Sequence, residues 1–228
     1  MGKDDLFQKW KAKKLKDIKR RKVNRQQYHK VLIVCEGQKT EPYYFRGLKD
    51  HYRLNTASIE ICSSGGSDPR SIIQFAKKRY LEEKNNGDPF DRVFCVFDKD
   101  DHQTYEMSME EIRKASPKNT YVPINSVPCF EYWILLHFVY TTSSFSSSHG
   151  KSACQQVVNT LKEYLPCYLK DNEDIFGQII DKIEVAKQNA KMSLQAAKSS
   201  YTDNPTTRVY NLMEYLQNIK KIGVVYLM

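Results

Sequence analysis

Residues 31–45, VLIVCEGQKTEPYYF, begin as a short apolar run and then place two carboxylates around a glycine. A continuous run of branched apolar residues is typical of a strand buried on both faces of a parallel sheet. Gly37 ends the run, and Thr40 and Pro42 suit the cap and the first turn of a following helix. The stretch therefore predicts a buried strand followed by a helix, with Glu36 at the carboxyl end of the strand.

The same strand-to-helix pattern occurs twice more along the chain. SIEIC (58–62) predicts a second strand, and Asp68 followed by Pro69 is a strong helix-start signal. RVFCVF (92–97) predicts a third buried strand that runs straight into DKDD. Three such units in a row predict an α/β fold with a parallel sheet and helices on both faces.

The second half of the chain changes character. NTYVPINS (119–126) predicts a fourth strand, and PCFEYWILLHFVY (128–140) suits either a helix or a strand, with Pro128 and the length favouring a helix. Beyond a Ser-rich loop the pattern becomes helical, and the last segment has an amphipathic helical face. We expect three regions: a basic arm over 1–30, an α/β core over 31–150 and a helical C-terminal region over 151–228.

The net charge of +9 is concentrated in the N-terminal arm. Residues 1–30 hold twelve basic and three acidic residues, so the remainder of the chain balances to zero. Clustered cations attract polyanions without reading sequence, because each neutralised phosphate releases counterions. The arm is either a nucleic-acid-binding segment or a solvated basic leader. The candidate phosphate contacts within it are Lys13, Lys14, Arg20, Arg21 and Lys22.

Composition excludes some classes of protein. No apolar run approaches the ~20 residues that a membrane-spanning helix needs, and the basic N-terminus does not have the pattern of a signal peptide. We therefore expect a cytoplasmic protein that does not contact the membrane. The six cysteines are scattered singly and form no Cys-x-x-Cys pair, so the sequence predicts reduced core cysteines rather than a zinc motif.

Acidic residues follow two of the predicted buried strands. Glu36 leaves the first, while Asp98 and Asp100 alternate after the third and can face one side. Ligands of parallel sheets bind beyond the carboxyl ends of the strands, and carboxylates gathered there repel one another unless a cation neutralises them. The pattern predicts a site for Mg²⁺ or Mn²⁺, which can position a phosphate and activate water.

Four motifs taken together resemble the RloB-like family, whose members are associated with bacterial restriction and abortive-infection loci. These motifs, in chain order, are CEGQKTEPYYF (35–45), VFDKDDH (96–102), PCFEYWILLHF (128–138) and NPTTRVYNLMEYL (204–216). A strand ending in Glu-Gly and a later one ending in Asp-x-Asp are similar to the Toprim fold of primases, topoisomerases and overcoming-lysogenization-defect nucleases. The resemblance implies a Toprim-like metal-binding core over 31–150.

The resemblance also implies roles for single residues. Glu36 would be a metal ligand or general acid/base, Asp98 and Asp100 would bind the metal, and Glu41 would be an accessory ligand. For Glu41, the helix dipole acting on a first-turn carboxylate is an equally open explanation. The chain departs from the family's Ser-Asn-Pro at Ser126-Val127-Pro128, so any role of that Asn is lost here.

Three further residues have alternative interpretations. Glu131 lies in an apolar stretch, where a carboxylate is costly without a partner, so we expect a catalytic role for it rather than a place on an exposed face. His137, six residues later, is interpreted as a core histidine rather than a catalytic one. Lys39 is either a phosphate contact or an ordinary surface lysine.

The resulting hypothesis is a Mg²⁺-dependent nuclease that cleaves RNA, with tRNA as one candidate, or DNA, as a defence effector beside an ABC- or AAA-type ATPase. The alternative is a catalytically silent subunit that binds nucleic acid or a partner. A primase-like nucleotidyl transferase would use the same carboxylates, but the chain shows no separate nucleotide-binding element.

Overall fold

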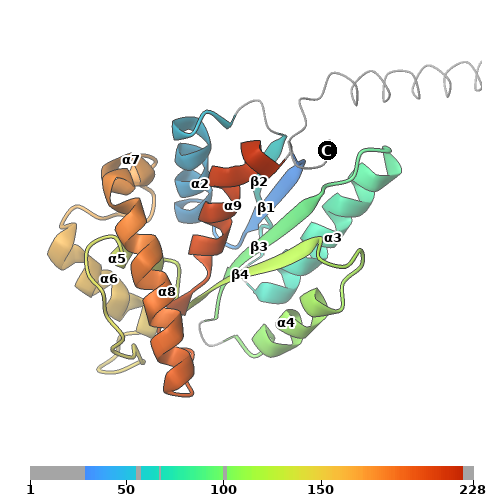
Figure 1. Ribbon diagram of the computed structural model, residues 1–228. Coiled ribbons are helices and arrows are strands. Elements are labelled where there is room, and N and C mark those ends of the chain that lie inside the picture. Colours follow the sequence, from blue (N-terminus) through green and yellow to red (C-terminus); the bar gives the residue numbers. More distant parts are fainter. Residues whose placement is uncertain (1–28, 55–57, 67, 100–101, 223–228) are drawn as a thin grey trace, which may run out of the picture.

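The computed structural model of the protein describes residues 29–54, 58–66, 68–99 and 102–222 (Figure 1). Its centre is a five-stranded sheet in the order β2-β1-β3-β4-β5. The first four strands are parallel, and β5 is antiparallel to β4. The predicted α/β fold is therefore confirmed. The strands are β1 (Val31–Cys35), β2 (Ile59–Ser63), β3 (Arg92–Asp98), β4 (Tyr121–Val127) and β5 (Thr206–Thr207).

Strand β1 is buried along its whole length, as its sequence predicts for an interior strand of a parallel sheet. It pairs with β2 on one side and with β3 on the other. Because side chains alternate along a strand, Leu32 and Val34 enter one hydrophobic core, whereas Val31, Ile33 and Cys35 enter the other. The sheet therefore separates two cores.

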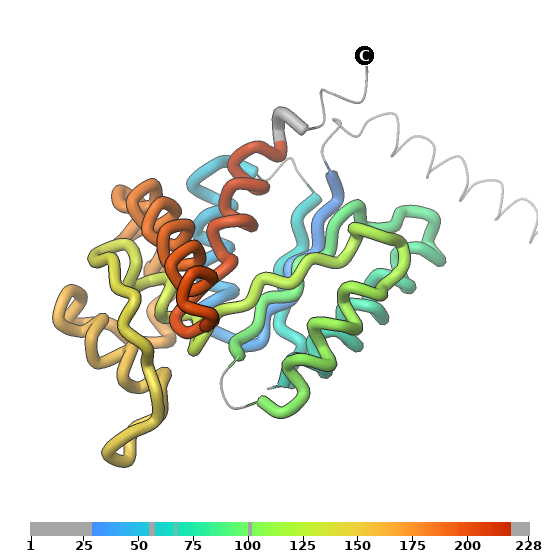
Figure 2. Tube along the Cα trace, turned by 60° about the horizontal axis from the view of Figure 1, so that its bottom comes forward, coloured from blue at the N-terminus to red at the C-terminus, as the bar shows by residue number. Residues whose placement is uncertain are grey.

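Helices cover both faces of the sheet. Helices α3 (Pro69–Asn85) and α4 (Tyr105–Arg113) lie on one face, whereas α9 (Val209–Ile222) and α8 (Ile183–Ser199) lie on the other, as Figure 2 shows. The second face is also covered by α2 and by a group of shorter elements. These are α2 (Thr40–His51), α5 (Glu131–Leu135), α6 (Ala153–Tyr164), α7 (Ile175–Ile179) and the 3₁₀ turn η2 (Ile180–Lys182).

The two predicted helix starts have different outcomes. Asp68 caps α3 as predicted, since its Oδ1 accepts hydrogen bonds from the backbone N–H groups of Arg70 (3.0 Å) and Ser71 (3.3 Å). The predicted cap by Thr40 is wrong. Thr40 is instead the first residue of α2, and its hydroxyl donates a 2.7 Å hydrogen bond to the carbonyl oxygen of Lys170. A contact with a distant loop has replaced the local cap.

The segment after β4 also differs from the simplest prediction. Only Glu131–Leu135 of the 128–140 stretch forms an α-helix, although the residues from Glu131 to His137 are all buried. The C-terminal region is mainly helical, and its short strand β5 extends the sheet beside β4. Its helix α9 packs into the same core as β1. Among the residues that the structure describes, no helix combines the length and apolar character needed to cross a membrane.

Candidate active site

The carboxyl ends of β1 and β3 bring Glu36 and Asp98 together. Cys35 is in register with Val96, and the Glu36 N–H donates to the Val96 carbonyl oxygen at 3.1 Å. The Glu36 Oε2 in turn accepts a 3.0 Å hydrogen bond from the backbone N–H of Asp98. The Nε2 of His102 lies 3.5 Å from Glu36 Oε1. The parallel register therefore fixes the Glu36 carboxylate against the end of β3.

Glu41 points back toward the end of β1 from the first turn of α2. Its Oε1 accepts a hydrogen bond of 3.4 Å from the backbone N–H of Gly37. A Cβ atom at Gly37 would overlap the Glu41 Oε2, so the close approach of this carboxylate requires glycine. Glu41 is 7% exposed, which places an acidic side chain in a nearly dry environment.

Glu131, the first residue of α5, has a different environment. Its side chain is 3% exposed, and the Lys170 Nζ lies 2.9 Å from its Oε1. The Tyr168 hydroxyl donates to the same oxygen at 3.2 Å, and the Cys154 thiol donates to Oε2 at 3.4 Å. Burial alone would raise the pKa of Glu131, but the Lys170 ammonium, followed by hydrogen bonds from Cys129 and the backbone, outweighs burial and lowers that pKa.

Among the described residues, the carboxylates of Glu41 and Asp98 have no paired ammonium group that offsets the cost of burying their charge. Burial, followed by repulsion from Glu131 and Glu36, raises the pKa of Glu41 to about 7. Burial and the neighbouring Glu41, Glu131 and Glu36 raise the pKa of Asp98 well above its ordinary value. Within the described part of the chain, no lysine or arginine pairs with Glu41 or Asp98. An external cation would therefore be bound favourably beside them.

These side chains line one cavity of ≈ 370 Å³. Phosphate groups and hydrated cations are small enough to enter a space of this size. The residues that line it are Glu36, Gly37, Gln38, Lys39, Thr40, Glu41, Asp98, Phe130, Glu131 and Lys170. The cavity therefore contains two lysines beside four carboxylates.

The structure brings together those predicted site residues that it describes. Glu36, Glu41, Asp98, Glu131 and Lys39 all line the cavity. As far as the described residues go, the oxygens of Glu36, Glu41 and Asp98 are not all within 4.8 Å of one another, so a shared ion would draw them closer. The other predicted site residues lie outside the described residues: Asp100, Lys13, Lys14, Arg20, Arg21 and Lys22.

His137 lies in the hydrophobic core. Its side chain is 1% exposed, and its Nδ1 is 3.0 Å from the Trp133 carbonyl oxygen. Burial lowers the pKa of His137 to about 4, so the imidazole is neutral at pH 7. The residue packs edge-on against Trp133 and Tyr44, as expected for a structural histidine.

Sequence reasoning missed Lys170 and Tyr168, although it singled out their partner Glu131. A buried carboxylate needs a cation or several donors, so a partner was predictable in kind. Its identity was not, because Lys170 lies 39 positions away in a loop with no periodic pattern, among 36 lysines and arginines. The contact depends on how the loop before α7 returns to α2, where the Lys170 carbonyl accepts from Thr40.

Comparison with known families supports the resemblance noted in the sequence. Residues 31–216 match the family described as RloB-like protein. The chain belongs to the RloB-like family. The matched range contains every described residue of the acidic cavity in this RloB-like chain. A comparison with functionally curated proteins finds no match.

Proposed function

We propose that this RloB-like protein is a Mg²⁺- or Mn²⁺-dependent phosphodiesterase that cleaves RNA or DNA in bacterial antiviral defence. The observation that carries the proposal is the meeting of Glu36, Glu41 and Asp98 with Lys170 in one cavity at the carboxyl edge of the sheet. The pKa values of the buried Glu41 and the half-buried Asp98 are raised, and such strongly perturbed groups are concentrated at functional sites.

The donor set fits a hard divalent cation. Glu36, Glu41 and Asp98 offer carboxylate oxygens, which are the ligands that Mg²⁺ and Mn²⁺ prefer. Repulsion among these groups supports the same assignment, because a cation replaces the protons that the raised pKa values favour. When bound, such an ion supplies electrostatic stabilisation of a phosphoryl group and a nucleophile at neutral pH.

The protein's own residues position the other participants. The backbone N–H of Asp98 fixes the Glu36 carboxylate, which can accept a proton from an attacking water, and the His102 Nε2 lies 3.5 Å from its Oε1. Glu131 holds the Lys170 ammonium at the cavity, where 60% of the Lys170 side chain remains exposed. That ammonium can bind a phosphate oxygen and stabilise the charge that develops on it. Lys39, 58% exposed beside Asp171, supplies a second cation at the rim.

The substrate class and the partner belong to the same proposal. RNA, with tRNA as one candidate, is favoured over DNA by analogy with related defence effectors, and that analogy operates at the level of the fold. An ABC- or AAA-type ATPase partner is proposed on the same basis. The basic arm would hold the polyanion while the cavity acts on one phosphodiester bond.

Cleavage of labelled tRNA pools and of single- and double-stranded DNA tests the proposal. The wild-type protein should cleave one of these substrates only with Mg²⁺ or Mn²⁺, and Glu36→Gln and Asp98→Asn should lose the activity. Glu106→Gln, which changes an exposed carboxylate on α4, should retain it. If neither the wild type nor a mixture with a cognate ATPase cleaves, while nucleic acid still binds, the silent-subunit alternative replaces the nuclease.

A further inference from the structure

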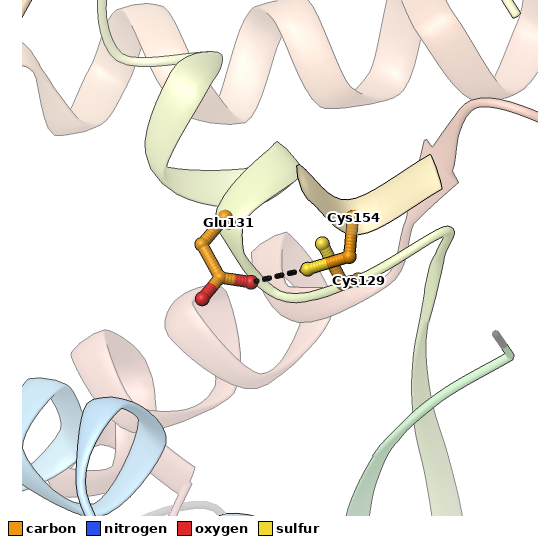
Figure 3. A group of neighbouring side chains, drawn as sticks. All are labelled: Cys129, Glu131 and Cys154. Carbon is orange, nitrogen blue, oxygen red and sulfur yellow. Dashed lines mark hydrogen bonds between the residues drawn. The ribbon is translucent and has the colours of Figure 1, made fainter. Parts of the chain in front are cut away.

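Two cysteines and Glu131 meet beside the acidic cavity (Figure 3). Cys129 lies between β4 and α5, Glu131 begins α5, and Cys154 lies in the first turn of α6. The two sulfur atoms and one carboxylate oxygen all lie within 4.8 Å of one another. Cys129 is buried, whereas Cys154 is only half-buried. The three donors therefore converge from separate segments, with an access route on the Cys154 side.

The spacing of these donors fits a tetrahedral metal centre. With Zn–S bonds of about 2.3 Å and a Zn–O bond of about 2.1 Å, tetrahedral geometry puts neighbouring ligand atoms about 3.5 to 3.8 Å apart. The Cys154 Sγ and the Glu131 Oε2 already lie 3.4 Å apart. The limit of 4.8 Å for all pairs means that contraction by about 1 Å brings every donor into range.

The surroundings of Glu131 leave the correct oxygen available. Lys170 and Tyr168 both contact Oε1, at 2.9 and 3.2 Å, whereas Oε2 faces the Cys154 thiol. A metal on Oε2 would therefore retain the Lys170 and Tyr168 contacts as partners that orient its carboxylate ligand. The Lys170 Nζ also lies 3.8 Å from the Cys154 Sγ, within reach of a thiolate.

The charges also balance. Two thiolates and one carboxylate carry three negative charges, which a divalent ion and the Lys170 ammonium neutralise together. This matters because Glu131 and Cys129 are buried, where a residual charge is costly. Lys170 therefore complements a metal at this position instead of competing with it.

We propose that Cys129, Glu131 and Cys154 form a binding site for a thiophilic divalent cation, with Zn²⁺ as the primary candidate. Thiolate ligands select Zn²⁺ over Mg²⁺, so this site differs in chemistry from the oxygen-lined cavity of Glu36, Glu41 and Asp98. Three protein ligands leave a fourth position open to water or another small ligand. The proposal does not depend on nuclease activity.

Titration of the reduced, chelator-treated full-length protein with Co²⁺ tests this site directly. Co²⁺ replacing Zn²⁺ in a thiolate site gives a sulfur-to-metal charge-transfer band and intense visible bands, which added Zn²⁺ should then remove. Cys154→Ser is the main variant because the residue is half-buried and the change is nearly isosteric. It should lose the charge-transfer band or weaken Zn²⁺ binding by more than ~100-fold, beyond the loss typical of an outer-shell partner. Cys167→Ser, which changes an exposed cysteine, is the matched control and should bind as wild type does.

A second variant tests the arrangement around the ligands. Lys170→Met should weaken Zn²⁺ binding by about tenfold while the cobalt spectrum keeps its shape, because an outer partner is lost and the ligands remain. Circular dichroism should confirm that each variant is folded. The proposal is overturned if the reduced wild-type protein shows no charge-transfer band, or if the band persists unchanged in folded Cys154→Ser. Detection of a Cys129–Cys154 disulfide, without metal uptake after reduction, would assign the pair to redox chemistry and overturn it equally.

Discussion

Replacing Lys170 with Met removes the ammonium that neutralises Glu131 and keeps the aliphatic stem of the side chain. Glu131 is 3% exposed, so its carboxylate cannot exchange the lost cation for bulk water. The Tyr168 hydroxyl and the Cys154 thiol remain as hydrogen-bond donors. Since Lys170 is the main cause that offsets burial, the pKa of Glu131 should rise above its ordinary value in the variant.

The magnitude follows from the burial of the two partners. Breaking a fully buried ion pair costs about 3 to 5 kcal/mol, and a hydrogen bond to a charged group contributes about 1.5 to 3 kcal/mol. The Lys170 side chain is 60% exposed, so solvent screening should place the cost of breaking this pair at or below the lower end of these free-energy ranges. We expect a loss of about 1 to 2 kcal/mol at pH 7, which for a chain of this size lowers Tm by about 2 to 8 °C.

The destabilisation caused by Lys170→Met should depend on pH, because the pKa of Glu131 differs between the two proteins. In the wild type the pKa of Glu131 is lowered, so the ion pair contributes stability above the ordinary carboxylate pKa and loses it as the pH falls through the lowered value. In Lys170→Met the same group has a raised pKa, so protonation relieves the cost of burying its charge. The difference in unfolding free energy between the two proteins should therefore decrease as the pH falls from 7 toward about 4.5.

Urea unfolding at several pH values, within a double-mutant cycle with Glu131→Gln, measures this effect. Lys170→Met should destabilise the wild-type background more than the Glu131→Gln background, because the carboxylate is absent in the latter. Lys39→Met is the matched control: its partner Asp171 lies 3.4 Å away, both side chains are more than half exposed, and the change should be below about 0.5 kcal/mol. Equal effects of the two lysine variants, or no coupling to Glu131, would refute the reasoning.

Two further predictions concern the unbalanced carboxylates. Asp98→Asn should raise Tm in the presence of EDTA, because burial and neighbouring carboxylates raise the pKa of Asp98 and make its ionisation costly. Calorimetry measures the change in Tm, and a lower Tm would argue against repulsion. The pKa of Glu41 is raised to about 7, so metal-free protein should lose stability as the pH rises from about 4.5 through 7, by at most about 3 kcal/mol. Glu41→Gln should abolish that part of the dependence in chemical unfolding experiments, and an unchanged pH profile would contradict the assignment.

The sequence predicted the parts of the fold that depend on local patterns. The apolar runs that form β1 and β3 predicted the parallel sheet. They also predicted where Glu36 and Asp98 lie, because the carboxyl ends of parallel strands meet at the same edge of the sheet. Asp68 and Pro69 located the start of α3, since capping depends on adjacent residues. The fold class and the shared location of the described acidic residues were therefore accessible without a structure.

Contacts between distant segments were not accessible. Thr40 is a residue type that commonly caps helices, but its hydroxyl donates to the distant Lys170 carbonyl oxygen instead of capping α2. The two residues of β5 are too short for a periodic signal and form a strand only through their register with β4. The scattered cysteines gave no zinc motif, yet Cys129 and Cys154 meet because α6 begins beside α5. In each case the contact is made by a residue in a distant segment, and no local sequence pattern indicates that the two segments meet.

Three of the four carboxylates in the cavity perform two different tasks. Glu131 has its own cation in Lys170, and its lowered pKa keeps it ionised, so it can hold that lysine at the cavity before any ligand arrives. Glu41 and Asp98 have raised pKa values and no lysine or arginine partner among the described residues, so a divalent ion relieves their repulsion. An ion that binds the folded chain and not the unfolded one stabilises it by mass action. The repulsion that destabilises the metal-free cavity is therefore also the reason for it to bind a cation, and removing Lys170 should leave that attraction intact.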